Sequence, residues 1–195
     1  FAIGSGEFVG IMGESGAGKS TLLSIMGAMN APSAGSLEVE GIDIYSLGQE
    51  QRADFRREFL GFVFQSFHLI AYLTLEENVM LPLATIRMPR RRKLAMARHA
   101  LAAVGLDCKG QRLPHQISGG EKERTAIPRA IVNQPPILLA DEPTGNLDEK
   151  TADRVLGQFL ELVRGQGSAA LVATHNERLA ARMDRVVRLH EGRIQ

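Results

Sequence analysis

The stretch Phe8-Val-Gly-Ile-Met-Gly-Glu-Ser-Gly-Ala-Gly-Lys-Ser20 decides the fold class of this chain. Its apolar part, from Phe8 to Met12, predicts a short buried strand. The glycine-rich part that follows fits the pattern G-x-x-x-x-G-K-[ST]. Apolar residues then recur at helical spacing as far as Met26, which predicts a helix directly after the loop. A strand, a glycine-rich loop and a helix in this order predict a phosphate-binding loop.

The loop has the chemistry to hold a nucleotide. Glycines let the backbone curl so that successive N–H groups converge on phosphate oxygens, and the helix adds its positive end. Lys19 can reach the β- and γ-phosphates, and the Ser20 hydroxyl can ligate Mg²⁺. A glycine-rich turn with a chance lysine is the alternative, and the flanking strand and helix argue against it. We therefore predict ATP and Mg²⁺ as ligands, held by Gly13, Glu14, Ser15, Gly16, Ala17, Gly18, Lys19, Ser20 and Thr21.

Further apolar runs predict an α/β sheet. They bound short buried strands and lie at Leu37–Val39, Leu60–Phe64, Ile137–Ala140 and Ala169–Thr174. Helical patterns separate them, which favours a mostly parallel sheet covered by helices on both faces. Thr74 and Glu77 form a capping-box pattern that opens a helix through Val79 and Leu83. We expect one domain over residues 1–195, with approximately 66–136 as an inserted helical lobe.

The composition bounds the possible partners. The chain has 195 residues, with 23 basic and 22 acidic side chains and a formal charge of +1, which argues against a surface built for nucleic acid. Cys108 is the single cysteine and cannot form an internal disulfide, so a reducing compartment is expected. The longest stretch without charged residues, Phe59–Leu75, is too short and too polar to span a membrane. Because the chain starts at Phe1 rather than Met, we expect its N-terminal strands to be missing.

Two later motifs add candidate chemistry. Ile117-Ser-Gly-Gly-Glu121 precedes a helical run, and a serine with glycines at a helix start suits an anion, although it is also an ordinary helix-start turn. Asp141 and Glu142 follow a buried strand as an acidic pair. Such a pair can place one carboxylate on a metal ion and the other toward a water molecule.

Taken together, these motifs resemble the ATP-binding-cassette (ABC) ATPases over essentially the whole chain. The matching motifs are Gly13–Ser20 (Walker A), Gln65 (glutamine loop), Ser118–Glu121 (signature), Ile137–Asp141 (Walker B), Asn146–Asp148 (D-loop) and His175 (switch histidine). The resemblance implies a P-loop NTPase of ABC type: a mostly parallel sheet flanked by helices, a small antiparallel β part and an inserted α-helical lobe.

The resemblance also implies how the residues act. Two copies would pair head to tail, so that ATP on one Walker loop is covered by Ser118, Gly119 and Gly120 of the partner copy. Glu121 and Asp148 are further nucleotide-binding residues that the resemblance implies. The implied catalytic residues are Glu142 beside the attacking water, His175 at the γ-phosphate, Lys19 and Gln65. The implied metal ligands are Ser20, Gln65 and Asp141. Taken alone, Gln65 would be a polar strand-end residue and His175 a capped surface histidine, so both roles depend on motif order and spacing.

One branch of the family fits best. Glu121, Phe62–Gln65 and Asp141–Asp148 resemble the branch that serves lipoprotein release and macrolide or peptide export. This implies an integral-membrane permease as partner, and a cytoplasmic protein peripheral to the inner face of the membrane. The apolar segment His68–Asn78 would receive the permease, or would simply pack the lobe. Changing Leu69 or Tyr72 to Glu should then uncouple permease binding from ATP binding.

Two alternatives to a transporter subunit stay open. One is a soluble ABC-type ATPase in DNA repair or translation, although the long insertions and second cassette typical of those proteins are missing here. The other is a regulatory module that binds nucleotide without turnover. No nucleic-acid partner is expected, because the basic run from Arg87 to Arg98 has no interleaved aromatic residues and fits a solvated helix face.

Two departures from the family pattern carry predictions. The aromatic residue that stacks on adenine lies about 25 positions before Walker A in the family, whereas twelve residues precede Gly13 here. Tyr45 and Tyr72 are not at matching positions. Pro128 falls inside the helix after the signature, where it loses a hydrogen bond at a cost of about 3 kcal/mol, so we predict a kink or a weakened helix.

Overall fold

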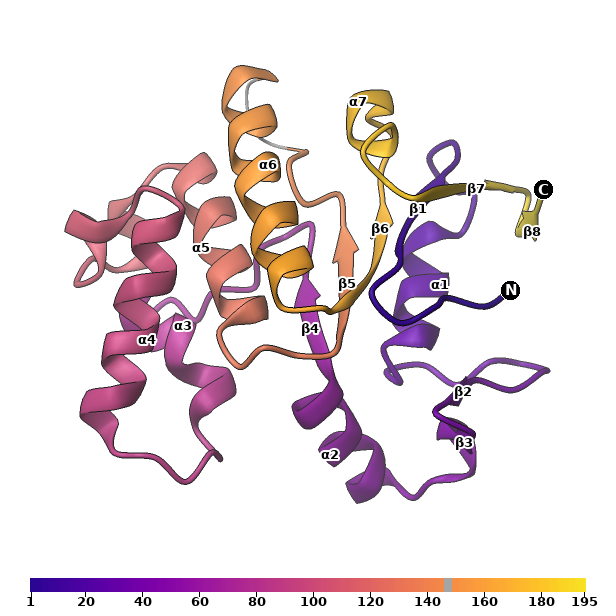
Figure 1. Cartoon of the computed structure of the whole chain (residues 1–195), viewed down its shortest axis with the longest axis horizontal. Coiled ribbons are helices and arrows are strands. Elements are labelled where there is room, and N and C mark those ends of the chain that lie inside the picture. The colour runs from indigo at the N-terminus through magenta and orange to yellow at the C-terminus, as the bar shows by residue number, and fades with distance from the viewer. Residues whose placement is uncertain (146–148) are drawn as a thin grey trace.

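The computed structural model describes residues 1–145 and 149–195, and these form a six-stranded sheet flanked by helices (Figure 1). The strand order is β4-β5-β6-β1-β7-β8. Neighbouring strands from β4 to β7 are parallel, and β8 runs antiparallel to β7. The strands are β1 (Phe8–Met12), β4 (Leu60–Val63), β5 (Ile137–Asp141), β6 (Ala169–Ala173), β7 (Arg185–His190) and β8 (Arg193–Ile194). The predicted mostly parallel α/β sheet is confirmed.

The helices and a small hairpin complete the fold. The hairpin pairs β2 (Glu38–Val39) with β3 (Ile42–Asp43) in antiparallel register, which confirms the small antiparallel part. The α-helices are α1 (Lys19–Met26), α2 (Gln49–Phe59), α3 (Leu75–Met80), α4 (Arg90–Ala103), α5 (Gly119–Ile131), α6 (Glu149–Gly165) and α7 (Glu177–Ala180). The 3-10 turns are η1 (Ile44–Ser46), η2 (Leu81–Leu83), η3 (Asp107–Lys109) and η4 (Pro114–Gln116).

Alternating side chains give the sheet two buried faces. Phe8 on β1 packs with α5, α6 and α7, whereas Val9 and Ile11 pack on the opposite face with Leu23 of α1. Side chains in a strand point alternately to opposite faces, so a continuous apolar run is buried only where both faces are covered. Each large apolar side chain buried in this way contributes about 1.5–3 kcal/mol. The sheet therefore holds the carboxyl ends of β1, β5 and β6 at one rigid edge.

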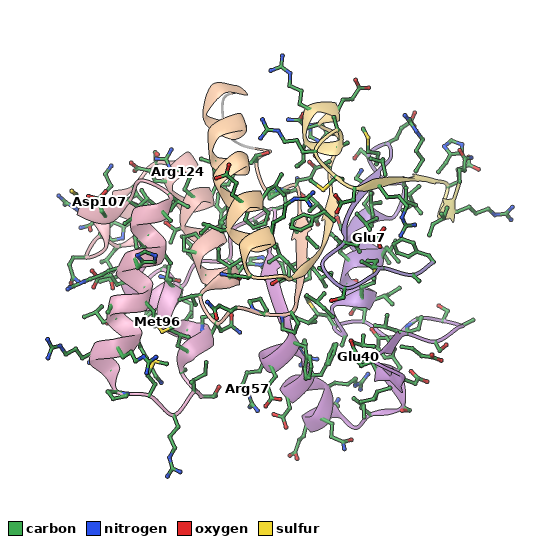
Figure 2. All side chains as sticks on the ribbon, viewed as in Figure 1. Glu7, Glu40, Arg57, Met96, Asp107 and Arg124 are labelled. Atoms are coloured by element: carbon green, nitrogen blue, oxygen red, sulfur yellow. The ribbon has the colours of Figure 1, made fainter. Side chains whose placement is uncertain are left out.

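The helices α3 and α4 lie beside the sheet and have an apolar cluster of their own (Figure 1). Leu75, Val79 and Leu101 are fully buried or nearly so in this cluster. Figure 2 labels Met96 in this region and Glu40 on the hairpin, at opposite sides of the view. Helix α5 joins the two parts, because Ile127 packs with the sheet and Val132 at the helix end packs with α3 and α4. That approximately residues 66–136 form an inserted helical lobe stays a prediction.

Four elements differ from the sequence expectations or refine them. Helix α2 and strand β7 were not anticipated. Helix α3 ends at Met80 and continues as the 3-10 turn η2, in which Pro82 lacks the N–H that an α-helix would use. Helix α5 continues through Pro128, whose carbonyl accepts from Val132 N at 3.0 Å; the kink stays a prediction.

In the described part of the chain, no helix combines the length and the apolar character needed to cross a bilayer.

Candidate functional site

The phosphate loop connects β1 to α1 in a conformation that only glycine accepts at several positions. Gly16 and Gly18 have φ angles of 84° and 100°, in the left-handed region. At Gly13, an added Cβ atom would lie 2.3 Å from the carbonyl oxygen of Leu189 on β7. Strand β7 therefore lies directly against the loop, and any side chain at this position would displace the backbone.

Lys19 lies across the phosphate loop. Its ammonium group donates to the carbonyl oxygens of Gly13 at 2.8 Å and Glu14 at 3.0 Å. These carbonyls hold the charge at the mouth of the loop, within reach of a phosphate. Ala17 is the exception among the predicted loop residues, because its side chain is buried in the apolar cluster beside α1. It shapes the loop from behind rather than facing a ligand.

A pocket of about 520 Å³ brings the predicted site residues together. It joins the phosphate loop to the ends of β4, β5 and β6. The predicted residues that line it are Gly13, Glu14, Ser15, Gly16, Gly18, Lys19, Ser20, Thr21, Gln65, Asp141, Glu142 and His175. Gly145 also lines it and was missed, since an isolated glycine carries no signal by itself. The pocket places amide groups, a lysine, three carboxylates and a histidine around one volume.

Glu142 and His175 are in direct contact in this pocket. Strand β5 ends at Asp141, and Glu142 then adopts a left-handed φ of 47° while its N–H donates to Ala173 O at 3.0 Å. Such strained non-glycine residues often occur at functional sites. His175 follows β6, and its Nδ1 lies 2.9 Å from Glu142 Oε1. The carboxylate is largely buried and the imidazole is exposed, so the histidine covers the carboxylate from the solvent side.

The pocket also suits a magnesium ion. Ser20, Gln65 and Asp141 offer a hydroxyl, an amide and a carboxylate to the lining of the same pocket. Mg²⁺ prefers such oxygen ligands and is usually held by one or two carboxylates together with phosphate oxygens. Among the described residues no group of three or more His, Cys, Asp or Glu side chains could hold a metal.

The signature turn lies outside this pocket. Ser118 caps α5: its Oγ accepts from Glu121 N at 3.3 Å, and the Glu121 carboxylate accepts from Ser118 N at 3.0 Å. An added Cβ at Gly119 would meet no described atom within 4 Å. The packing of this chain therefore does not require glycine at Gly119, and the turn presents a bare backbone surface. Asp148, the remaining predicted nucleotide contact, lies outside the described residues.

The two tyrosines excluded as adenine contacts lie away from the pocket lining. The Tyr45 hydroxyl is 2.6 Å from Ile25 O at the end of α1, and Tyr72 is 80% exposed. Neither residue lines the pocket around the phosphate loop.

Arg129 is a site residue that the sequence did not reveal. From α5, its guanidinium donates to Phe67 O and His68 O, both at 2.6 Å. Phe67 and His68 have left-handed φ angles of 60° and 48°, just after Gln65. Burial lowers the pKa of Arg129, as expected for a cation removed from water. A buried cation of the signature helix thus holds the strained segment behind Gln65, a contact across more than 60 residues that no local pattern predicts.

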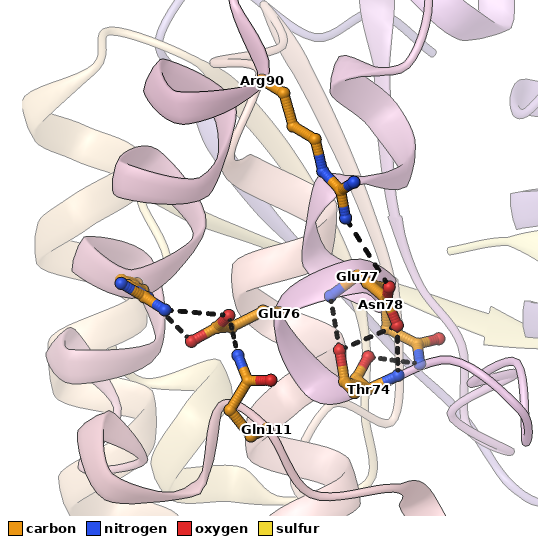
Figure 3. A network of polar contacts seen from close by, with 7 residues as sticks. Thr74, Glu76, Glu77, Asn78, Arg90 and Gln111 are labelled. Carbon is orange, nitrogen blue, oxygen red and sulfur yellow. Dashed lines mark hydrogen bonds and ion pairs between the residues drawn. The ribbon is translucent and has the colours of Figure 1, made fainter.

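A polar network fixes the start of α3 beside the same segment (Figure 3). The predicted capping box is present: Thr74 N donates to Glu77 Oε2 at 2.9 Å, and Glu77 N donates to Thr74 Oγ1 at 3.2 Å. Asn78 accepts from Ile70 N at 2.7 Å and donates to Ile70 O at 3.1 Å. These bonds hold the segment that follows Gln65 on one side, while Arg129 holds it on the other.

Comparison with known proteins identifies the family. The profile described as ABC transporter matches residues 1–145. The chain is 52% identical over 190 residues to the lipoprotein-releasing system ATP-binding protein LolD of Novosphingobium aromaticivorans, covering 97% of this chain and 85% of that relative. It is 49% identical over 193 residues to LolD 1 of Rhodospirillum rubrum, covering 99% and 85%.

Solved structures agree with these matches. The dimeric structure of the ATP-binding cassette MJ0796 in a post-hydrolysis state, bound to ADP and Pi, superposes with a TM-score of 0.94 at 38% identity, over 100% of this chain and 86% of that one. A second dimeric structure of the same bacterial ABC transporter cassette gives a TM-score of 0.95. The chain, as the order of its motifs predicts, belongs to the ABC transporter family as an ATPase cassette.

Proposed function

We propose that this cassette is the Mg-ATP-hydrolysing subunit of a lipoprotein-releasing transporter, and that it works as a head-to-tail dimer on a membrane permease. The observation that carries the proposal is the contact between Glu142 and His175 inside the pocket of the phosphate loop. Phosphoryl transfer to water needs positioned groups and charge stabilisation more than covalent chemistry from the protein. This pocket supplies groups that can position the water and charges that can stabilise the phosphoryl group.

Each pocket residue would have a role that follows from its position. The loop amides and Lys19 would bind the β- and γ-phosphates, replacing the carbonyl contacts that Lys19 makes at the loop. Ser20, Asp141 and Gln65 would hold Mg²⁺, which supplies charge neutralisation at the phosphate oxygens. Glu142 would orient the attacking water and accept its proton. His175 would leave the Glu142 carboxylate and donate a hydrogen bond to the γ-phosphate.

A second copy is needed because the signature turn is outside the pocket. Ser118, Gly119 and Gly120 would cover the nucleotide bound to the other cassette, and the bare surface at Gly119 allows a close approach. Both similar structures are dimers, and one holds ADP and Pi. Symmetric pairing uses the same two surfaces twice, so each dimer would enclose two nucleotides.

The names of the relatives support a permease partner. LolD is named as part of a lipoprotein-releasing system, and we infer that this chain would act beside a membrane component, on the cytoplasmic side where ATP is made. On this chain the permease would bind the segment 68–78, in which Tyr72 is 80% exposed. Tyr72→Glu and Leu69→Glu should then reduce co-purification with the permease, and retained co-purification after both changes would argue for lobe packing alone.

Substitution of Glu142 by Gln tests the proposal. This substitution removes the proton acceptor while keeping the size and shape of the side chain, so phosphate release should fall by about 10²- to 10⁴-fold. ATP-bound dimers should accumulate in size-exclusion chromatography with Mg²⁺. Glu161→Gln, an exposed site on α6 with the same charge change, is the control and should leave both readouts unaltered. Unchanged phosphate release in Glu142→Gln would instead identify a module that binds nucleotide without this chemistry.

A further inference from the structure

The signature turn carries a fixed negative charge. The carboxylate of Glu121 accepts from Ser118 N at 3.0 Å, in the first turn of α5. Its side chain is mostly buried, at 15% exposure, so the charge cannot move away from Ser118. Thr125 Oγ1 donates to Glu121 O at 2.7 Å and fixes the same residue from the next turn. The carboxylate therefore stays beside the serine wherever the turn is placed.

This charge conflicts with the turn's proposed partner. In the dimer, Ser118 and Gly119 would lie over the polyphosphate of a nucleotide on the second copy. A carboxylate held next to them would repel that polyanion, most strongly once the closing interface excludes water. The first turn of α1, which grips phosphate within its own chain, reads Lys19-Ser-Thr-Leu22 and has no carboxylate. The signature turn thus needs a compensating positive charge.

Lys109 supplies that charge from another element. It ends the 3-10 turn η3, twelve residues before Glu121, and its ammonium group is paired with Glu121 Oε1. The two carboxylate oxygens are therefore divided: one accepts from Lys109 and the other from Ser118 N. Consistent with this, the hydrogen bond from Lys109 lowers the pKa of Glu121, and the backbone bond from Ser118 lowers it further.

Several contacts hold the backbone around Lys109. They direct its ammonium group toward the Glu121 carboxylate. Glu76 N donates to Gly110 O at 2.9 Å, and a Cβ at Gly110 would lie 2.5 Å from the Glu76 carboxylate. Gln111 and Arg98 contact the same carboxylate, as Figure 3 shows for Gln111. Glu76 is 5% exposed. The start of α3 therefore fixes the short segment that presents Lys109 to the signature turn.

We propose that Lys109 is a positioning residue of the ATPase: it neutralises Glu121 and holds it against Ser118, so that the signature turn meets the polyphosphate on a second copy without charge repulsion. The inference rests on the proposed function, since it requires the turn to approach a nucleotide in a dimer. Lys109 itself does not touch the nucleotide. Its effect is electrostatic and acts through Glu121.

The test compares ATP turnover of the full chain with that of Lys109→Met over a range of Mg-ATP concentrations. With its carboxylate uncompensated, Lys109→Met should raise the KM for ATP about tenfold, while kcat stays within about twofold, because the catalytic pocket is untouched. Lys109→Arg keeps the charge and should restore KM. Arg91→Met, an exposed charge change on α4, is the matched control. The rise in KM should shrink as salt is added.

A second substitution separates electrostatics from structure. In a Glu121→Gln background there is no charge to compensate, so adding Lys109→Met should change KM no further. An equal rise in KM in both backgrounds, or a wild-type KM for Lys109→Met alone, overturns the inference about Lys109 while leaving the proposed function in place. A wild-type chain without Mg-dependent ATP turnover overturns the proposed function, and the inference with it.

Discussion

Two helix N-termini of this chain are proposed to meet phosphate, and they are built in opposite ways. Helix α1 begins after Gly18, which has a left-handed φ of 100° and, within the described residues, makes no side-chain capping bond. Helix α5 begins after Ser118, whose hydroxyl and whose partner Glu121 form a complete capping box. The first helix start leaves its amides to a ligand, and the second satisfies part of them from its own side chains.

The difference shows how one fold can use a helix start in two roles. At α1 the loop would enclose the ligand within one chain, so that free amides and Lys19 would supply the binding energy. At α5 the turn must be rigid before a second copy arrives, and a capping box gives that rigidity. The box also brings a carboxylate to a place where phosphate is expected. In our proposal, the lysine from another element that is paired with this carboxylate offsets that cost.

The largest effect should come from adding a methyl group at each turn. Gly13→Ala places Cβ 2.3 Å from Leu189 O, so we expect loss of ATP binding and a fall in unfolding free energy of about 2 kcal/mol or more. Gly119→Ala meets no described atom within 4 Å, so its stability should stay within about 0.5 kcal/mol of wild type while ATPase activity falls at least about tenfold. Denaturant unfolding and phosphate release measure the two. Equal stability losses would show that Gly119 is needed inside its own chain.

A second difference between the helices is the proline in α5. Pro128 removes the hydrogen bond that its N–H would donate one turn back, at a cost of about 3 kcal/mol in an ideal helix. Pro128→Ala should therefore raise the unfolding free energy by about 1–3 kcal/mol, the smaller values reflecting lost ring packing. Pro89→Ala, at the cap of α4 outside the helix interior, should give no such gain. An unchanged melting temperature and ATPase rate for Pro128→Ala would show that this site tolerates proline.

The capping boxes of α3 and α5 make a closer comparison. Thr74→Ala and Ser118→Ala remove the same kind of cap, so each should lower the unfolding free energy by about 1 kcal/mol. Only Ser118→Ala should also lower ATPase activity, since only its hydroxyl is proposed to meet a nucleotide. Thermal unfolding and turnover on the same samples test this. A similar loss of turnover in both variants would assign it to stability.

The smallest effect concerns acid. The pKa of Glu77 is lowered by its bonds from Thr74, and that of Glu121 by Lys109 and Ser118, relative to an ordinary value of 4.5. A lowered folded-state pKa gives stability that is present above the unfolded pKa and lost as pH falls through the folded one. The gap in melting temperature between wild type and Glu121→Gln should therefore be full at neutral pH and shrink below about pH 4.5. A gap that persists at about pH 3 would argue against the ionised cap.

The sequence predicted the elements whose signals are local. Strand β1 and the loop before α1 combine an apolar run with a motif, and the box at Thr74 joins residues three apart. Helix α2 was not predicted because Phe55 is its one buried residue. One buried residue cannot form a stripe of buried apolar side chains at helical spacing. Strand β7 escaped it because only Val187 and Leu189 are buried among exposed, largely charged neighbours.

The missed functional contacts are those between distant elements. Arg129 reaches Phe67 and His68 across more than 60 residues, and Lys109 reaches Glu121 from a separate 3-10 turn. Neither side chain differs in type from the many surface cations of this chain. Only the fold distinguishes Arg129 and Lys109 from those other cations. It brings the segment after Gln65 against Arg129 of helix α5, and it brings Lys109 against Glu121.

The position of β7 matters for anyone who modifies this protein. Leu189 O lies against Gly13, and Gly192 N donates to Ala17 O at 3.2 Å, so the β7–β8 hairpin packs on the back of the phosphate loop. A fluorescent reporter fused close behind β8, or a shortened variant that ends before β7, would disturb nucleotide affinity from behind the pocket. Labels intended to report on ATP without altering it belong on the exposed face of α4 instead.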